Sequence, residues 1–450
     1  MSIPFGFSPN NGDENELASM FENMGRMMRS GNASSTSSVD WIAARESART
    51  ALRQSGDPIP APESVDAIQQ SYDLADLWLN DATTFPSTSI SPLAMTRTAW
   101  VDATFDRWKE IVEPVADGVS RAMTSMMPSP EEAGSIHIPD EVLSQLPDDV
   151  AAQMRDMLQS PDFANMVAPL MAMAKSMGAT MFGSQFGEAL GQMANEVLCS
   201  SDVGFPLTNS TQPGFVVENV ATFASGLSMD VSDVRLYIAL RELAHQRLFA
   251  HAPWLGSQVL AAISEYSRGV QVDTARIEEA LAGIDPNNIE ELQTTLGADI
   301  FESARTPEQT AALERLEVLL ALIEGWVTSI VTLAASSRLP NASALEEVFR
   351  RRRAAGGPAE KLFSSLIGLE IRPRRMREAS ALWERITTER GAEARDSLWS
   401  HPDLLPRAED IENIDSFFAT DELDIMAELS KAMESGTPAP VEDEPGNSPE

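Results

Sequence analysis

The sequence predicts a mainly α-helical protein with little β-sheet and flexible ends. From Asp40 onward, apolar residues recur at the three- and four-residue spacing of a helix face. No run of five or more residues shows the apolar–polar alternation of a half-buried strand. Helix start signals support this fold class: Asp40 is placed as an N-cap, and Thr306-Pro307-Glu308-Gln309 has the pattern of a capping box with proline in the first turn.

The helices are expected at defined positions along the chain. The first four are predicted over 41–55, 63–82, 93–112 and 114–127, with Pro114 dividing the last two because proline breaks a helix interior. A Met-rich helical block over 143–199 and a loop over 200–215 follow. The later helices are expected over 230–250, 253–268, 274–283, 288–296, 307–335, 343–355, 358–368 and 373–390.

Composition shifts divide the chain into four parts. Residues 1–38 are rich in Gly, Asn and Ser, which predicts a flexible N-terminal segment. An N-terminal helical region is expected over 39–130, and the main helical domain over 131–434. Residues 435–450 are Pro-rich and acidic, which predicts a disordered tail.

The charge balance excludes several classes of function. With 33 Lys+Arg against 68 Asp+Glu, the net charge is −35, which opposes binding to nucleic acid or to anionic membranes. A single cysteine, Cys199, excludes an intramolecular disulfide and a cysteine-clustered zinc site, and indicates a reducing cytoplasm. The most apolar stretch, 316–335, carries Glu317 and Glu324, so we expect a buried helix and no membrane span.

One stretch, 230–255, carries side chains that are candidates for catalysis or metal binding. Arg241 and His245 lie one helical turn apart on a face that is otherwise apolar, with Glu242 beside them. The pattern R-E-x-x-H is that of the zinc-peptidase helix H-E-x-x-H with Arg at the first His. Alone, the pattern is weak, and it favours a buried core His beside a salt-bridged Arg–Glu pair over a metal site.

Strings along nearly the whole chain carry a family resemblance. The sequence resembles an actinobacterial family of hydrolases catalogued as zincin-like, zinc-dependent metallopeptidases, in a subgroup with Arg at the first His of the motif. The matching strings are 4–7 (PFGF), 74–79 (LADLWL), 181–185 (MFGSQ), 240–249 (LRELAHQRLF), 265–269 (EYSRG), 322–326 (LIEGW), 351–358 (RRRAAGGP) and 401–406 (HPDLLP).

The resemblance implies a zincin-like helical fold and a metal-dependent hydrolase that cleaves peptide or amide bonds. Glu242 would be the general base, His245 would bind zinc, and Arg241 would stabilise an oxyanion. Arg241 itself cannot bind a metal because a guanidinium stays protonated. The candidates for the remaining ligands are Glu324, within the apolar helix, Glu265, twenty residues after His245, and His251, six residues after it.

A competing interpretation gives Arg241 the role of the metal. Its guanidinium would supply the positive charge that Glu242, Glu324 or Glu265 otherwise gives to zinc. The sequence therefore leaves two functions open: a zinc-dependent hydrolase acting on a peptide or protein, and a catalytically silent interaction protein that retains the fold. Neither function implies a nucleic-acid partner, and zinc is the one cofactor to consider.

An arginine-rich stretch runs from 350 to 377. It holds eight Arg and one Lys against Glu360 and Glu370, a net charge of +7. From Arg407 onward the chain has 13 acidic and two basic residues, a net charge of −11. We expect most of the basic stretch to be a solvated helix face with intramolecular ion pairs, and a docking patch for an acidic segment or phosphate is the alternative.

Overall fold

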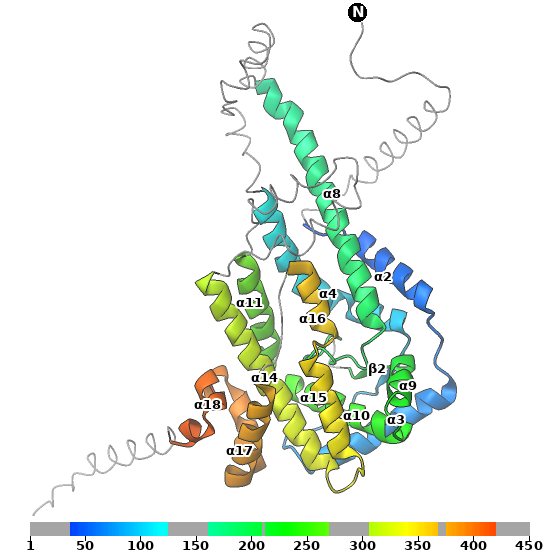
Figure 1. Ribbon diagram of the computed structural model, residues 1–450, viewed down its shortest axis with the longest axis vertical. Helices are drawn as coiled ribbons and strands as arrows, with labels where there is room; N and C mark the ends of the chain where they lie inside the picture. The colour runs from blue at the N-terminus through cyan, green and yellow to red at the C-terminus, as the bar shows by residue number, and fades with distance from the viewer. Residues whose placement is uncertain (1–36, 125–160, 209–211, 270–305, 368–374, 420–450) are drawn as a thin grey trace, which may run out of the picture. The chain divides into compact units, whose positions relative to one another are not determined.

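The computed structural model describes residues 37–124, 161–208, 212–269, 306–367 and 375–419. The chain divides into two units, Met1–Ser38 and Val39–Glu450, and all the described helices and strands lie in the second. Helices dominate this part and sheet is minor, which confirms the predicted fold class (Figure 1). The helices predicted over 274–283 and 288–296, and the predicted disorder of both ends, lie outside the described residues.

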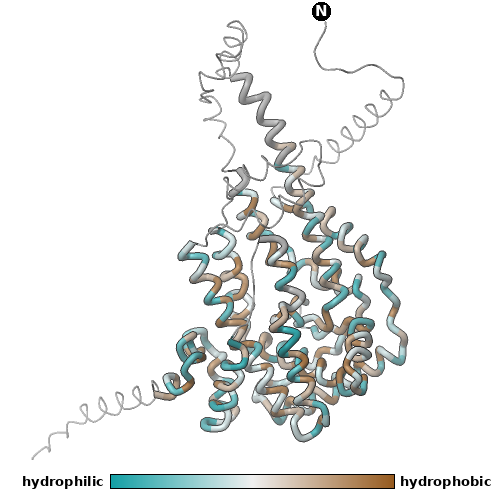
Figure 2. The backbone as a smooth tube through the Cα atoms, viewed as in Figure 1, coloured by the Kyte–Doolittle hydropathy of each residue, from teal (hydrophilic) through white to brown (hydrophobic). Residues whose placement is uncertain are grey.

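The first four described helices are α2 (Trp41–Ser55), α3 (Pro62–Leu79), α4 (Arg97–Thr124) and α8 (Pro161–Ala194). Of these, α2 and α3 match their predicted positions closely. Asp40 caps α2 as predicted, because its Oδ1 accepts hydrogen bonds from the backbone N–H groups of Ile42 and Ala43 at 3.1 and 3.0 Å. Apolar and hydrophilic residues alternate around most helix axes, as Figure 2 shows.

Helices α2 and α8 pack through glycines spaced four residues apart. A Cβ at Gly183 would lie 2.4 Å from the carbonyl oxygen of Asp40, and one at Gly187 would lie 2.0 Å from that of Ala44. Gly191 makes the same close approach to Ala48. Only glycine permits this spacing between two helix backbones, so the glycine repeat serves helix packing.

The prediction for 93–127 was wrong in two respects. Residues 93–95 form a short strand, β1 (Leu93–Met95), which pairs in parallel with β2 (Gly214–Val216). Helix α4 then continues through Pro114 without a break. Ile111 and Val115, on either side of the proline, are fully buried; their packing offsets the hydrogen bond that proline removes.

The second half of the described chain builds the helices around the candidate site. Helix α10 packs against α3 and α14, and α14 also packs against α11 and α17 (Figure 1). In order, these elements are α9 (Val217–Ser225), α10 (Val231–His251), α11 (Trp254–Arg268), α14 (Pro307–Ala335), α15 (Ala342–Ala354), α16 (Pro358–Ile367), α17 (Met376–Ser397), the 3₁₀ turns η2 (Leu398–Ser400) and η3 (Pro402–Leu404), and α18 (Ala408–Glu412).

Helix α14 is the most apolar helix and lies in the core. It begins at the predicted capping box: Thr306 Oγ1 accepts from the Gln309 backbone N–H at 3.2 Å, and Gln309 Oε1 accepts from the Thr306 N–H at 3.0 Å. Among the described residues it is the one helix long and apolar enough to cross a membrane, and 72% of its most apolar window is buried by other helices. That burial is typical of a core helix in a water-soluble protein.

Helices from the predicted 39–130 region share contacts with later helices. Helix α3 packs on α10, and α4 packs on α11 and α8. The predicted boundary at 130/131 itself lies outside the described residues.

Candidate functional site

Helix α10 carries the R-E-x-x-H pattern through the centre of the fold. Its N-cap is Asp230, whose Oδ1 accepts from the Ser232 backbone N–H at 2.8 Å. Every residue from Leu236 to Leu248 is buried, including Arg241, Glu242 and His245. Consecutive helical residues are rotated by about 100°, so Arg241 and His245 form one stripe along the helix and Glu242 and Gln246 form the adjacent stripe.

Glu324 lies at the centre of the cluster on the Arg241 face. Its Oε2 accepts from Nη2 of Arg241 at 2.5 Å. Its Oε1 lies 2.7 Å from Nη2 of Arg353, on α15, and 3.3 Å from Nε2 of His245. Helices α10 and α15 therefore direct two guanidinium groups and one imidazole at a single carboxylate of α14 that is 1% exposed.

The charges around Glu324 keep it ionised. Burial alone would raise its pKa, but the positive charges of Arg353 and Arg241, with the hydrogen bond from His245, hold the pKa well below the usual range. Burial would lower the pKa of Arg241, and Glu324 reverses that effect, so the pKa of Arg241 is raised. The cluster is a permanent buried ion pair at physiological pH.

His245 is held on both ring nitrogens. Nδ1 lies 2.8 Å from the carbonyl oxygen of Arg241, and Nε2 faces Glu324. The ring of His245 is therefore oriented by the backbone of α10 on one side and lies against the buried carboxylate on the other.

Glu242 points away from this cluster into a separate hydrogen-bond network. It accepts from the hydroxyl groups of Ser200 and Ser201, from the backbone N–H groups of Ser201 and Gly214 at 2.9 and 3.2 Å, and from Nε2 of Gln246 at 2.9 Å. The side chain is fully buried. With five donors and no exposure, this carboxylate has no free lone pair with which to activate a water molecule.

The neighbouring cysteine, Cys199, is also largely inaccessible to solvent. Cys199 is buried, and burial raises the pKa of its thiol well above the usual range, with the charges of Glu242 and Asp202 adding to the effect. A protonated, buried thiol is a poor nucleophile.

The other two candidate ligands lie away from the cluster. Glu265 forms an ion pair with Arg315, which precedes Glu324 on α14 by nine residues, or about 13 Å along the helix. His251 stacks on Phe85, with ring centroids 5.0 Å apart, and its Nδ1 lies 2.8 Å from the carbonyl oxygen of Arg247. The structure thus brings Arg241, His245 and Glu324 together and leaves Glu265 and His251 outside.

The residues present do not fit a catalytic zinc ion. Such a site takes three protein ligands and keeps one open position. Here His245 and Glu324 are the two candidates that meet, and both oxygens of Glu324 already accept from arginines. No group of three or more His, Cys, Asp or Glu side chains suited to a metal occurs in the described part of the chain.

Arg353 is the functional residue that sequence reasoning missed. It lies in the arginine-rich stretch, which was expected to form surface ion pairs. Two of its neighbours do so: Arg351 pairs with Glu347 and Lys361 with Glu196, whereas Arg352 pairs with the buried Asp202. Arg353 instead points inward, and no local sequence signal separates it from the adjacent arginines.

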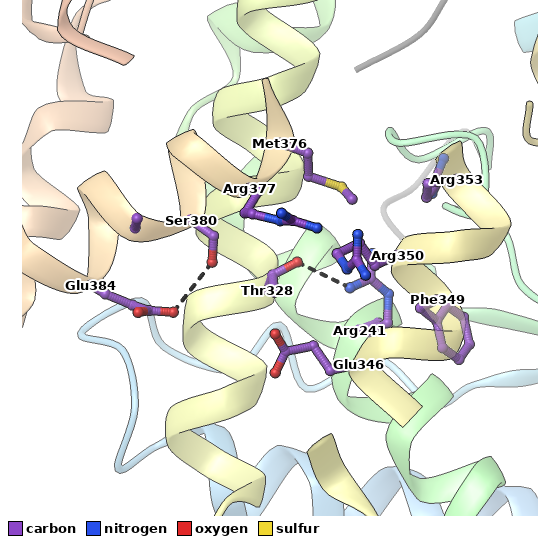
Figure 3. Close-up of a pocket in the computed structure, with 11 residues that line it drawn as sticks. Arg241, Thr328, Glu346, Phe349, Arg350, Arg353, Met376, Arg377, Ser380 and Glu384 are labelled. Carbon is purple, nitrogen blue, oxygen red and sulfur yellow. Dashed lines mark hydrogen bonds between the residues drawn. The ribbon is translucent and has the colours of Figure 1, made fainter. Parts of the chain in front are cut away.

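A cavity opens beside the cluster, between α10, α14, α15 and α17. Its volume is about 170 Å³, and Arg241 and Arg353 form part of its wall (Figure 3). Arg241 also lies over the ring of Phe349, with Cζ 5.3 Å from the centroid. The side chain of Arg241 on α10 is therefore accessible to a ligand in this cavity.

Comparison with known proteins agrees with the helical fold. The family model of zincin-like metallopeptidases matches residues 39–418. A protein from Chloroflexus aurantiacus, named a "putative hydrolase with a novel fold", superposes with a TM-score of 0.56 and 17% identity over 85% of this chain and 99% of its own. At that identity the likeness concerns the fold alone. Comparison with curated proteins gives no match.

The family match covers the whole described region, including the helices that carry Arg241, His245 and Glu324. The match indicates that the scaffold is that of metal-dependent hydrolases. Together with the helical structure, it confirms the predicted zincin-like fold. The chain belongs to the zincin-like metallopeptidase family.

Proposed function

We propose that this member of the family is a catalytically silent binding protein, in which arginines take the place of a catalytic zinc ion. The observation that carries the proposal is the pairing of both Glu324 oxygens, one with Arg241 at 2.5 Å and the other with Arg353 at 2.7 Å. A carboxylate that would bind zinc is neutralised by fixed cations instead.

The arrangement of Glu242 supports the same proposal. A zinc peptidase uses this glutamate to accept a proton from the metal-bound water. Here the carboxylate is fully buried among five hydrogen-bond donors, in a network separate from that of His245. A general base must lie within hydrogen-bond reach of the proton it accepts, and Glu242 has no route to such a proton.

The competing function is a zinc-dependent hydrolase with a degenerate R-E-x-x-H motif, which family membership favours. In that case His245 and Glu324 would hold the metal and Arg241 would stabilise the oxyanion. It would require Arg241 and Arg353 to leave Glu324 and a third ligand to be supplied. Breaking a buried ion pair costs about 3–5 kcal/mol, so this rearrangement is the less favourable of the two.

The partner we propose is a peptide or protein in the cytoplasm. A net charge of −35 opposes nucleic acid, and a lone buried cysteine suits a reducing compartment. The family's scaffold is that of enzymes acting on peptides, so a retained peptide-binding surface is the simplest remnant of that function.

Metal analysis of the full chain, purified without a histidine tag, tests the proposal. We expect substoichiometric zinc and no hydrolysis of a mixed peptide library, both before and after incubation with zinc. One tightly held zinc ion per chain, together with peptide cleavage that a chelator abolishes, would establish the competing function instead.

A further inference from the structure

The cavity between α10, α14, α15 and α17 has an unusual wall. Of its eleven lining residues, four are arginines, contributed by three helices: Arg241, Arg350, Arg353 and Arg377. Two carboxylates, Glu346 and Glu384, complete the charged part of the lining. In Figure 3 the side chain of Arg377 extends from α17 toward Arg350 and Arg241.

The carboxylates near these arginines already have partners. Glu324 is shared by Arg241 and Arg353, and Glu347 accepts from Arg350. Glu346 accepts from the Thr332 hydroxyl at 2.9 Å. The lining itself therefore has four arginines against two carboxylates, and Glu324 and Glu347, which lie behind it, balance the remaining two charges.

One arginine of the wall holds unused donor capacity. Within the described part of the chain, Arg377 makes no ion pair or hydrogen bond. The Nε of Arg353 also lacks a hydrogen-bond partner among the same residues, but this atom is buried and does not face the cavity space. Arg377 is therefore the donor that an anion in the cavity would meet.

The rest of the lining indicates which anion fits. Phe349, Met376 and Ala381 offer apolar contact, which suits an organic ligand more than a free inorganic ion. Glu346 and Glu384 would repel a doubly charged phosphate more strongly than a singly charged carboxylate. The same two side chains could accept hydrogen bonds from the N–H groups of a peptide.

We propose that this cavity binds the carboxylate of a peptide ligand, with Arg377 as its principal donor. The proposal rests on the proposed function, since it identifies what the silent protein binds. The carboxylate comes either from a peptide's C-terminus or from an acidic side chain. Long-range repulsion by the acidic chain is screened beyond about 8 Å at physiological salt, so the local arginines decide binding.

Isothermal titration of the full chain with defined probes tests the site. The probes are acetyl-trialanine with a free carboxylate, acetyl-alanyl-aspartyl-alanine amide with an acidic side chain, acetyl-trialanine amide as the neutral control, and inorganic phosphate. We expect at least one carboxylate probe to bind with a dissociation constant on the order of 1 mM or tighter. The better of the two identifies the source of the carboxylate.

Arg377→Gln is the variant that tests the assignment, because Arg377 is exposed and supports no other described contact. We expect it to weaken carboxylate binding by about tenfold, the loss of one charge-assisted hydrogen bond. Arg351→Gln is the matched control: it removes the same charge from an arginine that is 77% exposed and outside the cavity wall. It should bind as wild type does.

Four results would overturn the site: no binding of either carboxylate probe, equal binding of the neutral amide, phosphate binding more tightly than both carboxylates, or equal losses in the two variants. Repeating the titration with a chelator separates this proposal from the preceding one. Binding that persists with chelator and fails in Arg377→Gln supports the anion site whatever the zinc analysis gives. Binding that the chelator abolishes would overturn the anion site and point to a metal.

Discussion

The two carboxylates buried against α10, Glu242 and Glu324, are stabilised by different kinds of hydrogen-bond donor. Glu242 is surrounded by neutral donors, namely the serine hydroxyls, backbone N–H groups and an amide. Glu324, which packs against the Arg241 face, is neutralised by two guanidinium groups. A zinc peptidase needs its glutamate base and its metal ligands to converge on one water molecule, and here they are divided between two networks.

The proposed function follows from this difference between the two carboxylates. Replacing one imidazole by Arg241 removes a ligand and adds a cation, and Arg353 reinforces the effect from a second helix. Once the carboxylate at 324 has two fixed cations, a metal would add a third positive group at the same place. The remaining glutamate, Glu242, then serves to hold the 199–201 loop and β2 against α10.

The largest effect is expected from Glu324→Gln, because it leaves Arg241 and Arg353 buried without their anion. Removing one partner of a buried ion pair costs about 3–5 kcal/mol. Urea unfolding measures the change in free energy of unfolding. Glu314→Gln, at an exposed position on the same helix, is the control and should stay within about 0.5 kcal/mol of wild type. Equal stability of Glu324→Gln and wild type would show that the cluster is not the ion-pair centre described.

Glu242→Gln should destabilise the other face by a smaller amount. The amide replaces a carboxylate that accepts from all sides, so its NH₂ group meets donors where acceptors are needed. We expect a loss of about 1.5–3 kcal/mol, the range for hydrogen bonds to a charged group, from the same unfolding experiment. Unchanged stability combined with the loss of a measurable peptidase activity would assign Glu242 to catalysis instead.

Lowering the pH should reduce the difference in the free energy of unfolding between wild type and Glu324→Gln. The pKa of Glu324 is lowered in the folded protein, so its ionised form contributes stability above its unfolded pKa of about 4.3 and loses it as pH falls toward the folded pKa. Unfolding free energies measured from pH 7 downward should therefore converge for the two proteins below about pH 4.3. A constant difference down to about pH 3 would contradict the lowered pKa.

The smallest effects are expected outside both networks. Glu265 is a partly exposed side chain paired with Arg315, so Glu265→Gln should change stability by no more than about 0.5 kcal/mol. His251→Ala loses its stacking on Phe85, which is worth about 0.5–1.5 kcal/mol. Thermal unfolding with and without zinc measures both. A zinc-dependent stabilisation of wild type that either variant abolishes would place that residue in a metal site.

Much of this arrangement could be predicted from the sequence. The capping signals at Asp40 and Thr306 act locally, so their helices begin where expected. An unpaired carboxylate in the middle of an apolar helix requires a partner, and this argument, together with the family resemblance at 322–326, made Glu324 a candidate neighbour of His245. The starts of these helices and the need of Glu324 for a partner can both be predicted from short stretches of sequence.

Other features depend on contacts between distant segments, which no single stretch reveals. The burial around Pro114 overrides the proline's tendency to break α4. Arg353 is one of four consecutive arginines, and only the packing of α15 against α14 decides which one points inward. The donors that enclose Glu242 come from a loop some forty residues earlier in the chain, where Ser200 and Ser201 carry no recognisable motif.

Zinc titration of wild type and Arg241→His, side by side under calorimetry, tests the central claim most directly. The variant regains the second imidazole one turn before His245, beside Glu324. If Arg241 takes the place of the metal, wild type gives no binding heat at zinc concentrations up to about 100 μM, while Arg241→His gains affinity by about tenfold or more. Stoichiometric zinc binding by wild type, at an affinity equal to that of the variant, would contradict the account.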